Sequence, residues 1–247
     1  MKAGKVYLVG AGPGNPELLT LKAAELLKSA DVVIFDRLIQ EEVLGFCKPS
    51  AERICMGQAV GQDESRQDEI HALLLQKAME GKMVVRLKGG DPFLFGRGGE
   101  EMEFLAEKGL DFEVVPGVSS ALAAPLAARI PVTHRALAST VAIVTGQGSK
   151  GKPDCIPWDA LARLDTLVFL MSVRNLAGIC SRLIENGRKP DTPAAMIQTA
   201  FWPGQRVITG TLADIADAVA EADIQPPVTL VIGAVVNVGK KLQGRTG

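Results

Sequence analysis

Short apolar runs alternate with segments of helical period through the first half of the chain. The runs expected to form strands are 6–9, 31–35, 53–56 and 83–87. The segments expected to form helices are 17–29, 66–79 and 100–108. The strand runs are apolar along nearly their whole length, which is typical of a parallel sheet with both faces covered by helices. This alternation predicts an α/β fold.

A second series of elements begins after Pro116-Gly117. An alanine-rich helix is expected over 120–128, followed by strands at 140–145, 167–171, 194–199, 206–209 and 229–235. The close spacing of the later strands favours a mixed sheet. A length of 247 residues lies between one and two domains of ~150 residues. We therefore predict two α/β domains, 1–116 and 117–247.

The charge balance excludes several classes of partner. Lys and Arg number 27 against 28 Asp and Glu, a net charge of −1, so no global positive field gathers nucleic acid or an anionic membrane. Aromatic residues make up 4%, which leaves few platforms for stacked bases. No apolar run approaches the ~20 residues of a membrane span. An anionic ligand must therefore meet a local cluster of arginines.

The cysteines indicate a compartment more than a chemistry. Cys47, Cys55, Cys155 and Cys180 form no C-x-x-C pair and no recurring ligand spacing, so neither a metal site nor a redox motif is expected. We expect four buried thiols in a reducing cytosol. The first residues carry no apolar signal segment, which favours a cytoplasmic protein.

The first glycine-rich segment, Gly10 to Asn15, follows a strand and precedes a helix. It departs from the dinucleotide fingerprint, because Asn15 stands where a third glycine is needed and Pro13 removes a backbone donor. A nicotinamide oxidoreductase is disfavoured accordingly. Either a plain tight turn or a flat ligand lying close to the backbone is compatible with this segment.

The segment 86–101 is more informative, because it places five glycines and two phenylalanines in a loop after a strand. Ligands of open α/β sheets bind outside such carboxyl ends, and a loop this rich in special backbone positions is typical of a site. Asp91 offers a carboxylate that can accept from a ribose hydroxyl or an ammonium. Arg97 is a fixed cation, and Glu100 is expected in the first turn of a helix.

A third segment runs from Pro116 to Arg135. Ser119 or Ser120 can cap the following helix, and Arg135 can anchor a carboxylate. The two histidines, His71 and His134, have no nucleophile or second histidine near them in sequence. They are interpreted as structural or surface residues, and a hydrolytic triad is not expected.

Four parts of the chain carry a resemblance to a known family. They are Val9-Gly10-Ala11-Gly12-Pro13-Gly14, Phe35-Asp36-Arg37-Leu38, the run 85–101 built around Lys88-Gly89-Gly90-Asp91-Pro92-Phe93, and 115–120 together with 131–135. The chain resembles the tetrapyrrole methylases over nearly its whole length, from Val6 to Val235. The run 88–101 is the most specific part, since simple dinucleotide folds do not carry it.

The resemblance implies two α/β domains with the active site in a cleft between them. It also implies S-adenosylmethionine as methyl donor, S-adenosylhomocysteine as product, no metal, and a homodimer. The family's donor-binding positions fall on Pro13, Gly89, Gly90, Asp91, Leu94, Ser119, Ser120, Met171 and Ala200. Its polar positions toward the tetrapyrrole fall on Asp36, Arg97, Glu100 and Arg135.

The implied reaction is methylation of uroporphyrinogen III at C2 and C7, giving precorrin-2 through precorrin-1, for siroheme or cobalamin. One alternative is a later corrin-pathway methylase that uses the same donor. A different class of alternative is a non-catalytic tetrapyrrole-binding protein. We do not expect the dehydrogenase and chelatase domain of the multifunctional family members, since its ~150 residues would not fit beside two domains.

The chemistry of C-methylation agrees with this set of residues. An electron-rich pyrrole carbon can attack the sulfonium methyl in line, so the enzyme needs positioning and no protein nucleophile. A ring proton must then leave, and Asp36 and Glu100 are the candidate acceptors. Arginine with a pKa above ~12 is a poor base. Arg97 and Arg135 are therefore expected to hold the substrate's carboxylates.

One departure from the family pattern falls in the segment 56–67. Gln58 stands where close relatives carry a lysine proposed as proton donor, and an amide cannot donate a proton at neutral pH. Either the lysine is dispensable, or the chain binds its tetrapyrrole differently, or it acts on a related one.

Overall fold

The computed structural model describes residues 3–57, 64–147 and 155–243, and the chain divides into two compact units. The first unit is Met1–Ser119 and the second is Ser120–Gly247. Each unit holds one sheet with its own helices and hydrophobic core. The domain boundary expected at residue 116 and the cleft expected between domains stay predictions.

The sheet of the first unit is entirely parallel, as the apolar runs predict. Its strands are β1 (Val6–Gly10), β2 (Val32–Phe35), β3 (Glu52–Cys55), β4 (Val84–Lys88) and β5 (Phe112–Val115). They lie in the order β3-β2-β4-β1-β5. β1 has a neighbouring strand on each side: Val6 lies opposite Val84 of β4 and opposite Phe112 of β5. The carboxyl ends of all five strands therefore lie at one edge.

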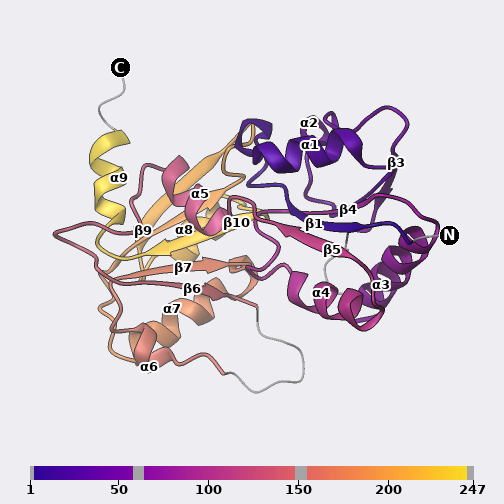
Figure 1. Ribbon diagram of the computed structural model, residues 1–247. Coiled ribbons are helices and arrows are strands. Elements are labelled where there is room, and N and C mark those ends of the chain that lie inside the picture. Colours follow the sequence, from indigo (N-terminus) through magenta and orange to yellow (C-terminus); the bar gives the residue numbers. More distant parts are fainter. Residues whose placement is uncertain (1–2, 58–63, 148–154, 244–247) are drawn as a thin grey trace. The chain divides into compact units, whose positions relative to one another are not determined.

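Helices cover both faces of this sheet (Figure 1). α1 (Leu21–Ser29) and α2 (Glu41–Leu44) bury Leu27 and Val43 against one face. α3 (Glu64–Met79) and α4 (Gly98–Glu107) bury Leu74 and Leu105 against the other. Burial of both faces explains why the strands read as continuous apolar runs.

The helix expected over 17–29 is interrupted. A 3-10 turn, η1 (Pro16–Leu18), ends at Leu18, and α1 starts only after Thr20. The physical reason is a cap: the Thr20 hydroxyl accepts from the Ala23 amide at 3.1 Å, which fixes the start of the helix there.

The second unit holds the mixed sheet that the close strand spacing favours. Its strands are β6 (Val141–Thr145), β7 (Thr166–Leu170), β8 (Pro193–Gln198), β9 (Arg206–Thr211) and β10 (Val228–Ile232). Their order is β6-β7-β10-β8-β9. β6 and β7 are parallel, whereas β10 is antiparallel to both β7 and β8, and β9 is antiparallel to β8.

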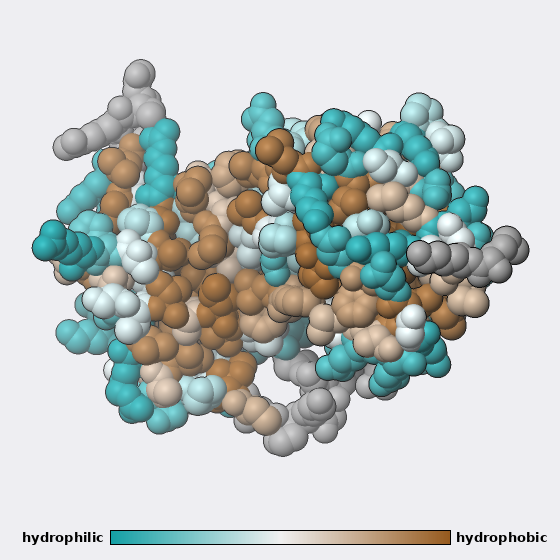
Figure 2. Space-filling view, viewed as in Figure 1, coloured by the Kyte–Doolittle hydropathy of each residue, from teal (hydrophilic) through white to brown (hydrophobic). Residues whose placement is uncertain are grey.

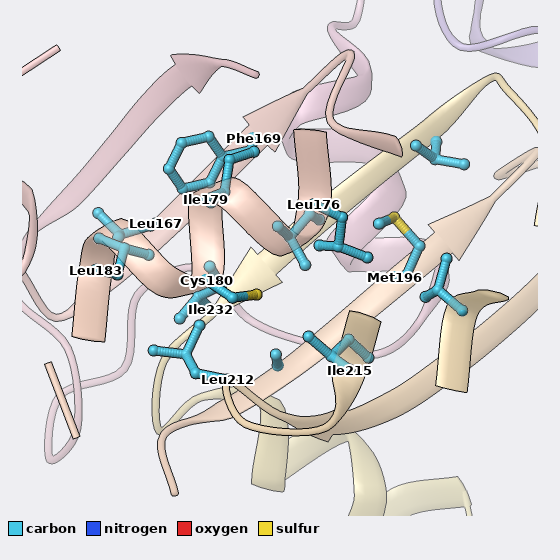
Figure 3. Packing of buried hydrophobic residues seen from close by; sticks show 14 of the residues in the cluster. Leu167, Phe169, Leu176, Ile179, Cys180, Leu183, Met196, Leu212, Ile215 and Ile232 are labelled. Atoms are coloured by element: carbon cyan, nitrogen blue, oxygen red, sulfur yellow. The ribbon is translucent and has the colours of Figure 1, made fainter. Parts of the chain in front are cut away.

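The larger core of the second unit lies between its sheet and three helices. These helices are α6 (Trp158–Leu161), α7 (Leu176–Glu185), which follows the 3-10 turn η2 (Val173–Asn175), and α8 (Ile215–Glu221). Figure 3 shows Leu167 and Phe169 of β7 beside Ile179 and Leu183 of α7. A second cluster packs residues of α5 (Ser120–Ala127) and α9 (Val236–Gln243) against the sheet.

The surface of the second unit has an apolar region. In the face drawn in Figure 2, apolar side chains gather over the region of α5, where Leu122 and Leu126 are 52% and 67% exposed. Within the described ranges, none of the helices combines the length and the apolar character needed to cross a membrane.

The prediction of four buried thiols is wrong for two of them. Cys47 and Cys180 are buried, whereas Cys55 and Cys155 are exposed, and none of the four forms a disulfide. Cys55 ends β3, an edge strand of its sheet, which among the described residues pairs with a neighbouring strand on one side only.

Candidate functional site

The candidate site of the first unit begins where β1 and β4 end. These strands are neighbours, but α1 after β1 and α4 after β4 cover opposite faces of the sheet. Such a switch point opens a crevice outside the carboxyl ends of the strands, which is where ligands of open α/β sheets bind. Two hydrogen bonds join the loops there: Gly12 N donates to Gly90 O at 3.2 Å, and Gly90 N donates to Gly12 O at 2.8 Å.

Glycines bring three of the loops into backbone contact. A Cβ on Gly10 would lie 2.5 Å from Gly117 N, and a Cβ on Gly117 would lie 2.2 Å from Gly90 O. Only residues without a side chain allow this approach of the ends of β1, β4 and β5. Gly89 differs, because a Cβ there would meet no atom within 4 Å and the residue is exposed. Its backbone is open to a ligand.

Asp91 ties two of these loops together. Its Oδ1 accepts from Phe93 N at 2.9 Å, and its Oδ2 accepts from Gly117 N at 3.2 Å. The sequence predicts that this carboxylate accepts from a ribose hydroxyl or an ammonium. Each oxygen holds one backbone donor and retains a second lone pair for a ligand.

The loop after β4 is held in an uncommon backbone conformation. Phe95 and Arg97 have φ values of 54° and 59°, a left-handed conformation that disfavours residues with a Cβ. Strain of this kind, of order 1–3 kcal/mol per residue, is concentrated at functional sites. With the backbone in this conformation, the Arg97 side chain contacts Glu100 in the first turn of α4. The guanidinium Nε and Nη2 donate to the Glu100 carboxylate at 3.0 Å and 2.6 Å.

Arg97 also controls the ionisation of Glu100. The hydrogen bond from its guanidinium lowers the pKa of Glu100 below the ordinary value, against an opposing effect of partial burial. Both carboxylate oxygens of Glu100 accept from Arg97. Glu100 is therefore an ionised partner of Arg97 and a weak proton acceptor.

Asp36, directly after β2, belongs to a buried charge cluster. Arg86 Nη2 donates to Asp36 Oδ1, and Arg86 Nε donates to Glu101 Oε1 at 3.0 Å. Lys88 Nζ donates to the same Glu101 oxygen at 2.9 Å. Burial opposes the charge of Arg86, but Asp36 and Glu101 outweigh it and raise the pKa of Arg86. Burial and the charge of Arg86 together lower the pKa of Lys88.

The carboxylate of Asp36 reaches the surface from this cluster. Its side chain is 32% exposed, whereas those of Arg86 and Glu101 are 2% and 0% exposed. Oδ1 is held by Arg86, and Oδ2 has no hydrogen-bond partner among the described residues. One oxygen is thus fixed, and the other is available to accept a proton.

Arg86, Lys88 and Glu101 are functional candidates that the sequence alone does not predict. A signal was present: two cations at alternate positions of an otherwise apolar, buried strand require carboxylate partners inside the protein. The partner on α4 lies 15 residues from Arg86 and the partner after β2 lies 50 residues from it, so no local spacing identifies them.

The other predicted donor-site residues of the first unit lie in the same loops. Pro13 follows β1, Leu94 follows β4, and Ser119 follows β5, and all three are partly buried. The structure therefore brings together the predicted residues of the first unit at the carboxyl edge of its sheet. Gln58 lies outside the described residues.

Two predicted residues of the second unit share an edge of its sheet. Met171 directly follows β7 and Ala200 follows β8; these strands flank β10 and are antiparallel to it, so both end at the same edge. Met171 has a φ of 56° and is 46% exposed. Thr199 and Phe201, on either side of Ala200, also have positive φ values of 46° and 64°. Ser120 is the first residue of α5.

Arg135 lies in an exposed turn between α5 and β6. The turn is closed by His134 N donating to Ala138 O at 3.0 Å and Ala138 N donating to His134 O at 2.9 Å. His134 Nδ1 accepts from Ala136 N, and His71 stacks on Phe104 with 4.4 Å between ring centroids. Both histidines have the structural roles predicted for them. In the described ranges, no three His, Cys, Asp or Glu side chains gather as a metal site would require.

Comparisons with known proteins place these loops in a family context. Residues 5–216 match the model of the Tetrapyrrole (Corrin/Porphyrin) Methylases. The chain is 46% identical to a uroporphyrinogen-III C-methyltransferase of Priestia megaterium, covering 95% of this chain and 99% of that protein. It is 47% identical to a siroheme synthase of Pseudomonas putida, covering 98% of this chain and 52% of that protein.

A solved structure agrees with the relatives. The chain is 44% identical to a uroporphyrin-III C-methyl transferase from Thermus thermophilus complexed with S-adenyl homocysteine, with a TM-score of 0.82. The match covers 95% of this chain and 94% of that one. The chain spans about half the length of the siroheme synthases that it matches.

Proposed function

Because this chain belongs to the tetrapyrrole (corrin/porphyrin) methylases, we propose that it transfers methyl groups from S-adenosylmethionine to uroporphyrinogen III. The products are precorrin-1 after the first transfer to a ring carbon and precorrin-2 after the second, at C2 and C7. The family relationship and a similar Thermus thermophilus protein whose structure holds the demethylated donor both support this reaction.

The observation that carries the proposal is the meeting of glycine-lined loops at the β1/β4 switch point. Gly89 leaves backbone open there, and Pro13 removes a backbone donor that a pyrophosphate would use, which favours a donor without phosphates. We assign the donor to residues of this edge and to those matching the family pattern in the second unit. They are Pro13, Gly89, Gly90, Asp91, Leu94, Ser119, Ser120, Met171 and Ala200.

The acceptor is held and deprotonated by other residues. Arg97 and Arg135 bind the acidic groups of the tetrapyrrole through charge-assisted hydrogen bonds. The Arg97 side chain is 32% exposed and Arg135 lies in an exposed turn, so Arg97 offers the stronger pairing, because partly buried charge pairs bind more strongly than exposed ones. Methyl transfer then needs only in-line positioning of the carbon and the sulfonium. Of the two candidate bases, Asp36 is favoured over Glu100. It keeps an available oxygen, whereas both oxygens of Glu100 accept from Arg97.

A second candidate function rests on Gln58. The family resemblance implies a lysine at this position, whereas this chain has an amide, and an amide cannot donate a proton. That difference favours a later methylase of the corrin pathway that uses the same donor. A non-catalytic tetrapyrrole-binding protein is the third possibility, and the retention of the whole loop 88–101 disfavours it.

The assembly and compartment are also part of the proposal. We infer a homodimer, in keeping with the family resemblance, and the exposed leucines of α5 are compatible with a subunit contact. Two exposed cysteines that form no disulfide, Cys55 and Cys155, suit a reducing compartment such as the cytoplasm. Light scattering of the purified protein tests the dimer.

The reaction is tested with the purified chain under anaerobic conditions. It is incubated with uroporphyrinogen III and methyl-labelled S-adenosylmethionine, and the products are analysed by mass spectrometry. Two added methyl groups support the proposed reaction. A parallel incubation offers a contracted or metallated ring in place of uroporphyrinogen III, and methylation of that ring alone supports the second candidate. Tetrapyrrole binding without methylation in either incubation supports a carrier.

A further inference from the structure

Asp36, Arg86, Lys88 and Glu101 form a buried charge cluster that stability of the fold alone does not explain. Arg86 and Lys88 on β4 face Asp36 and Glu101, so two cations meet two carboxylates in a region where only Asp36 reaches solvent. Desolvating such charges is expensive, and replacing buried ion pairs by apolar residues is often neutral or stabilising. The cluster therefore has a reason beyond stability.

We propose that Arg86 is a positioning residue, which fixes the Asp36 carboxylate in the orientation from which its free oxygen accepts the ring proton. This inference rests on the proposed function. Arg86 itself is 2% exposed, so it acts through Asp36 and not on the substrate.

The guanidinium of Arg86 is held at each of its nitrogens. Nε donates to Glu101, Nη2 donates to Asp36, and Nη1 lies 3.5 Å from Ile34 O and 3.4 Å from Leu87 O. A planar group with every edge engaged cannot rotate without losing contacts. Since Ile34 belongs to β2 and Leu87 to β4, Arg86 also links the two neighbouring strands.

Glu101 anchors this arrangement from α4. Its Oε1 accepts from Arg86, from Lys88 and, at 3.4 Å, from Gln67 of α3. Glu101 directly follows Glu100 in the first turn of α4. The cluster therefore links Asp36, directly after β2, to the helix turn that carries Glu100, and it fixes the spacing of both candidate acid–base groups.

The test is a double-mutant cycle on methyl transfer. Arg86→Met keeps the length of the side chain and removes its donors, Asp36→Asn removes the base, and the third variant combines them. We expect each single change to lower kcat on the order of 10²-fold, since general base catalysis contributes about 10²–10⁴-fold. The KM for uroporphyrinogen III and the affinity for S-adenosylhomocysteine should stay close to wild type. Because Arg86 acts through Asp36, the double variant should be no slower than Asp36→Asn alone.

Arg188→Met is the matched control. Arg188 is also buried, at 8% exposed, and its guanidinium donates to the Leu164 and Asp165 carbonyls in the second unit. Its loss should lower the thermal midpoint without a selective loss of kcat. Arg86→Lys is used if Arg86→Met does not fold. It keeps the buried charge, but one ammonium cannot contact both carboxylates as the guanidinium does, so kcat should still fall.

A crystal structure of the Arg86 variant provides a readout independent of activity, in which Asp36 should leave its wild-type rotamer. Three results would overturn the inference. The losses of kcat could multiply in the double variant, or kcat of the Arg86 variant could fall only as far as its stability does, as in Arg188→Met. The third is an Asp36 rotamer that is unchanged in the Arg86 variant. A wild-type enzyme that methylates nothing would overturn the proposed function instead, and the rotamer comparison would still decide whether Arg86 fixes Asp36.

Discussion

Single glycines distinguish backbone that packs against protein from backbone that is open to a ligand. Gly89→Ala adds a methyl group where no protein atom lies within 4 Å, so we expect an unchanged thermal midpoint. If the donor lies against this backbone, the methyl group occupies its space, and the Kd for S-adenosylhomocysteine should rise about tenfold, or ~1.4 kcal/mol. Isothermal titration calorimetry measures the change.

Gly99→Ala is the control for this substitution. It lies in the first turn of α4, and an added Cβ there also meets no atom within 4 Å. The Kd should not change in this variant. Equal affinities for wild type and Gly89→Ala would show that the donor does not lie at Gly89.

The four thiols should separate into two classes by reactivity. Burial raises the pKa of the Cys180 thiol to about 11 and also raises that of Cys47, so little thiolate forms at pH 8. Cys55 and Cys155 are exposed. Iodoacetamide at pH 8 should therefore modify Cys55 and Cys155 in the native protein, and Cys47 and Cys180 only in denaturant. Peptide mass spectrometry reads the sites, and native labelling of Cys180 would contradict its burial.

At the scale of elements, the ends of β1, β4 and β5 depend on one close contact. A Cβ on Gly117 would lie 2.2 Å from Gly90 O and 2.7 Å from Gly10 Cα, both backbone atoms that cannot turn aside. Gly117→Ala must therefore separate the loops. We expect a loss of about 1–3 kcal/mol of unfolding free energy, as in other overpacked sites. Urea unfolding measures it, and a stability equal to that of Gly89→Ala would contradict the contact.

Asp31 connects the start of β2 to the start of β4 and should make stability depend on pH. Its carboxylate accepts from Lys48 Nζ at 2.7 Å and from Met83 N at 2.9 Å. The Lys48 hydrogen bond and then the Met83 amide lower the pKa of Asp31 below its ordinary value of 3.8. A lowered folded-state pKa stabilises the protein above the unfolded-state value, and the effect is lost as the pH falls through the folded-state pKa.

Asp31→Asn should therefore be less stable than wild type by on the order of 1 kcal/mol at pH 7, the net contribution of a typical hydrogen bond. The difference should shrink as the pH falls below 3.8. Urea unfolding of both proteins at several pH values measures it. A difference that stays constant into acid would show that the charge of Asp31 does not contribute.

The sequence predicts elements where burial leaves a pattern. β4 and β7 are buried at every position, and their apolar runs predict them. β5 is four residues with a glutamate in the second position, too short and too mixed for a pattern, so the sequence does not predict it. The loops of the candidate site were predicted because glycine and proline mark special backbone locally. The charge cluster was not, since its partners meet only through the fold.

At the scale of the whole molecule, the net charge is close to zero, so a charged ligand is attracted by individual side chains and not by the protein as a whole. A formal charge of −1 gives no attraction at a distance, so we expect binding of the proposed acidic substrate to depend on individual arginines, for which Arg97 and Arg135 are proposed. Each of the two units carries part of the predicted donor set on one sheet edge. Donor binding should therefore be visible in the unfolding of the chain as a whole.

Stabilisation of the protein by its donor distinguishes a methylase from a nicotinamide oxidoreductase, the other class of enzyme considered for the glycine-rich segment Gly10 to Asn15. A ligand that binds only the folded state adds about 2.7 kcal/mol at 100 times its Kd. For a protein of this size each kcal/mol moves the thermal midpoint by about 2–4 °C. S-adenosylhomocysteine should thus raise the midpoint by about 5–10 °C in scanning fluorimetry. NAD at the same concentration should not, because Pro13 and Asn15 break the pyrophosphate-binding pattern. A shift with NAD and none with S-adenosylhomocysteine would assign the loops to a nucleotide and end the methylase interpretation.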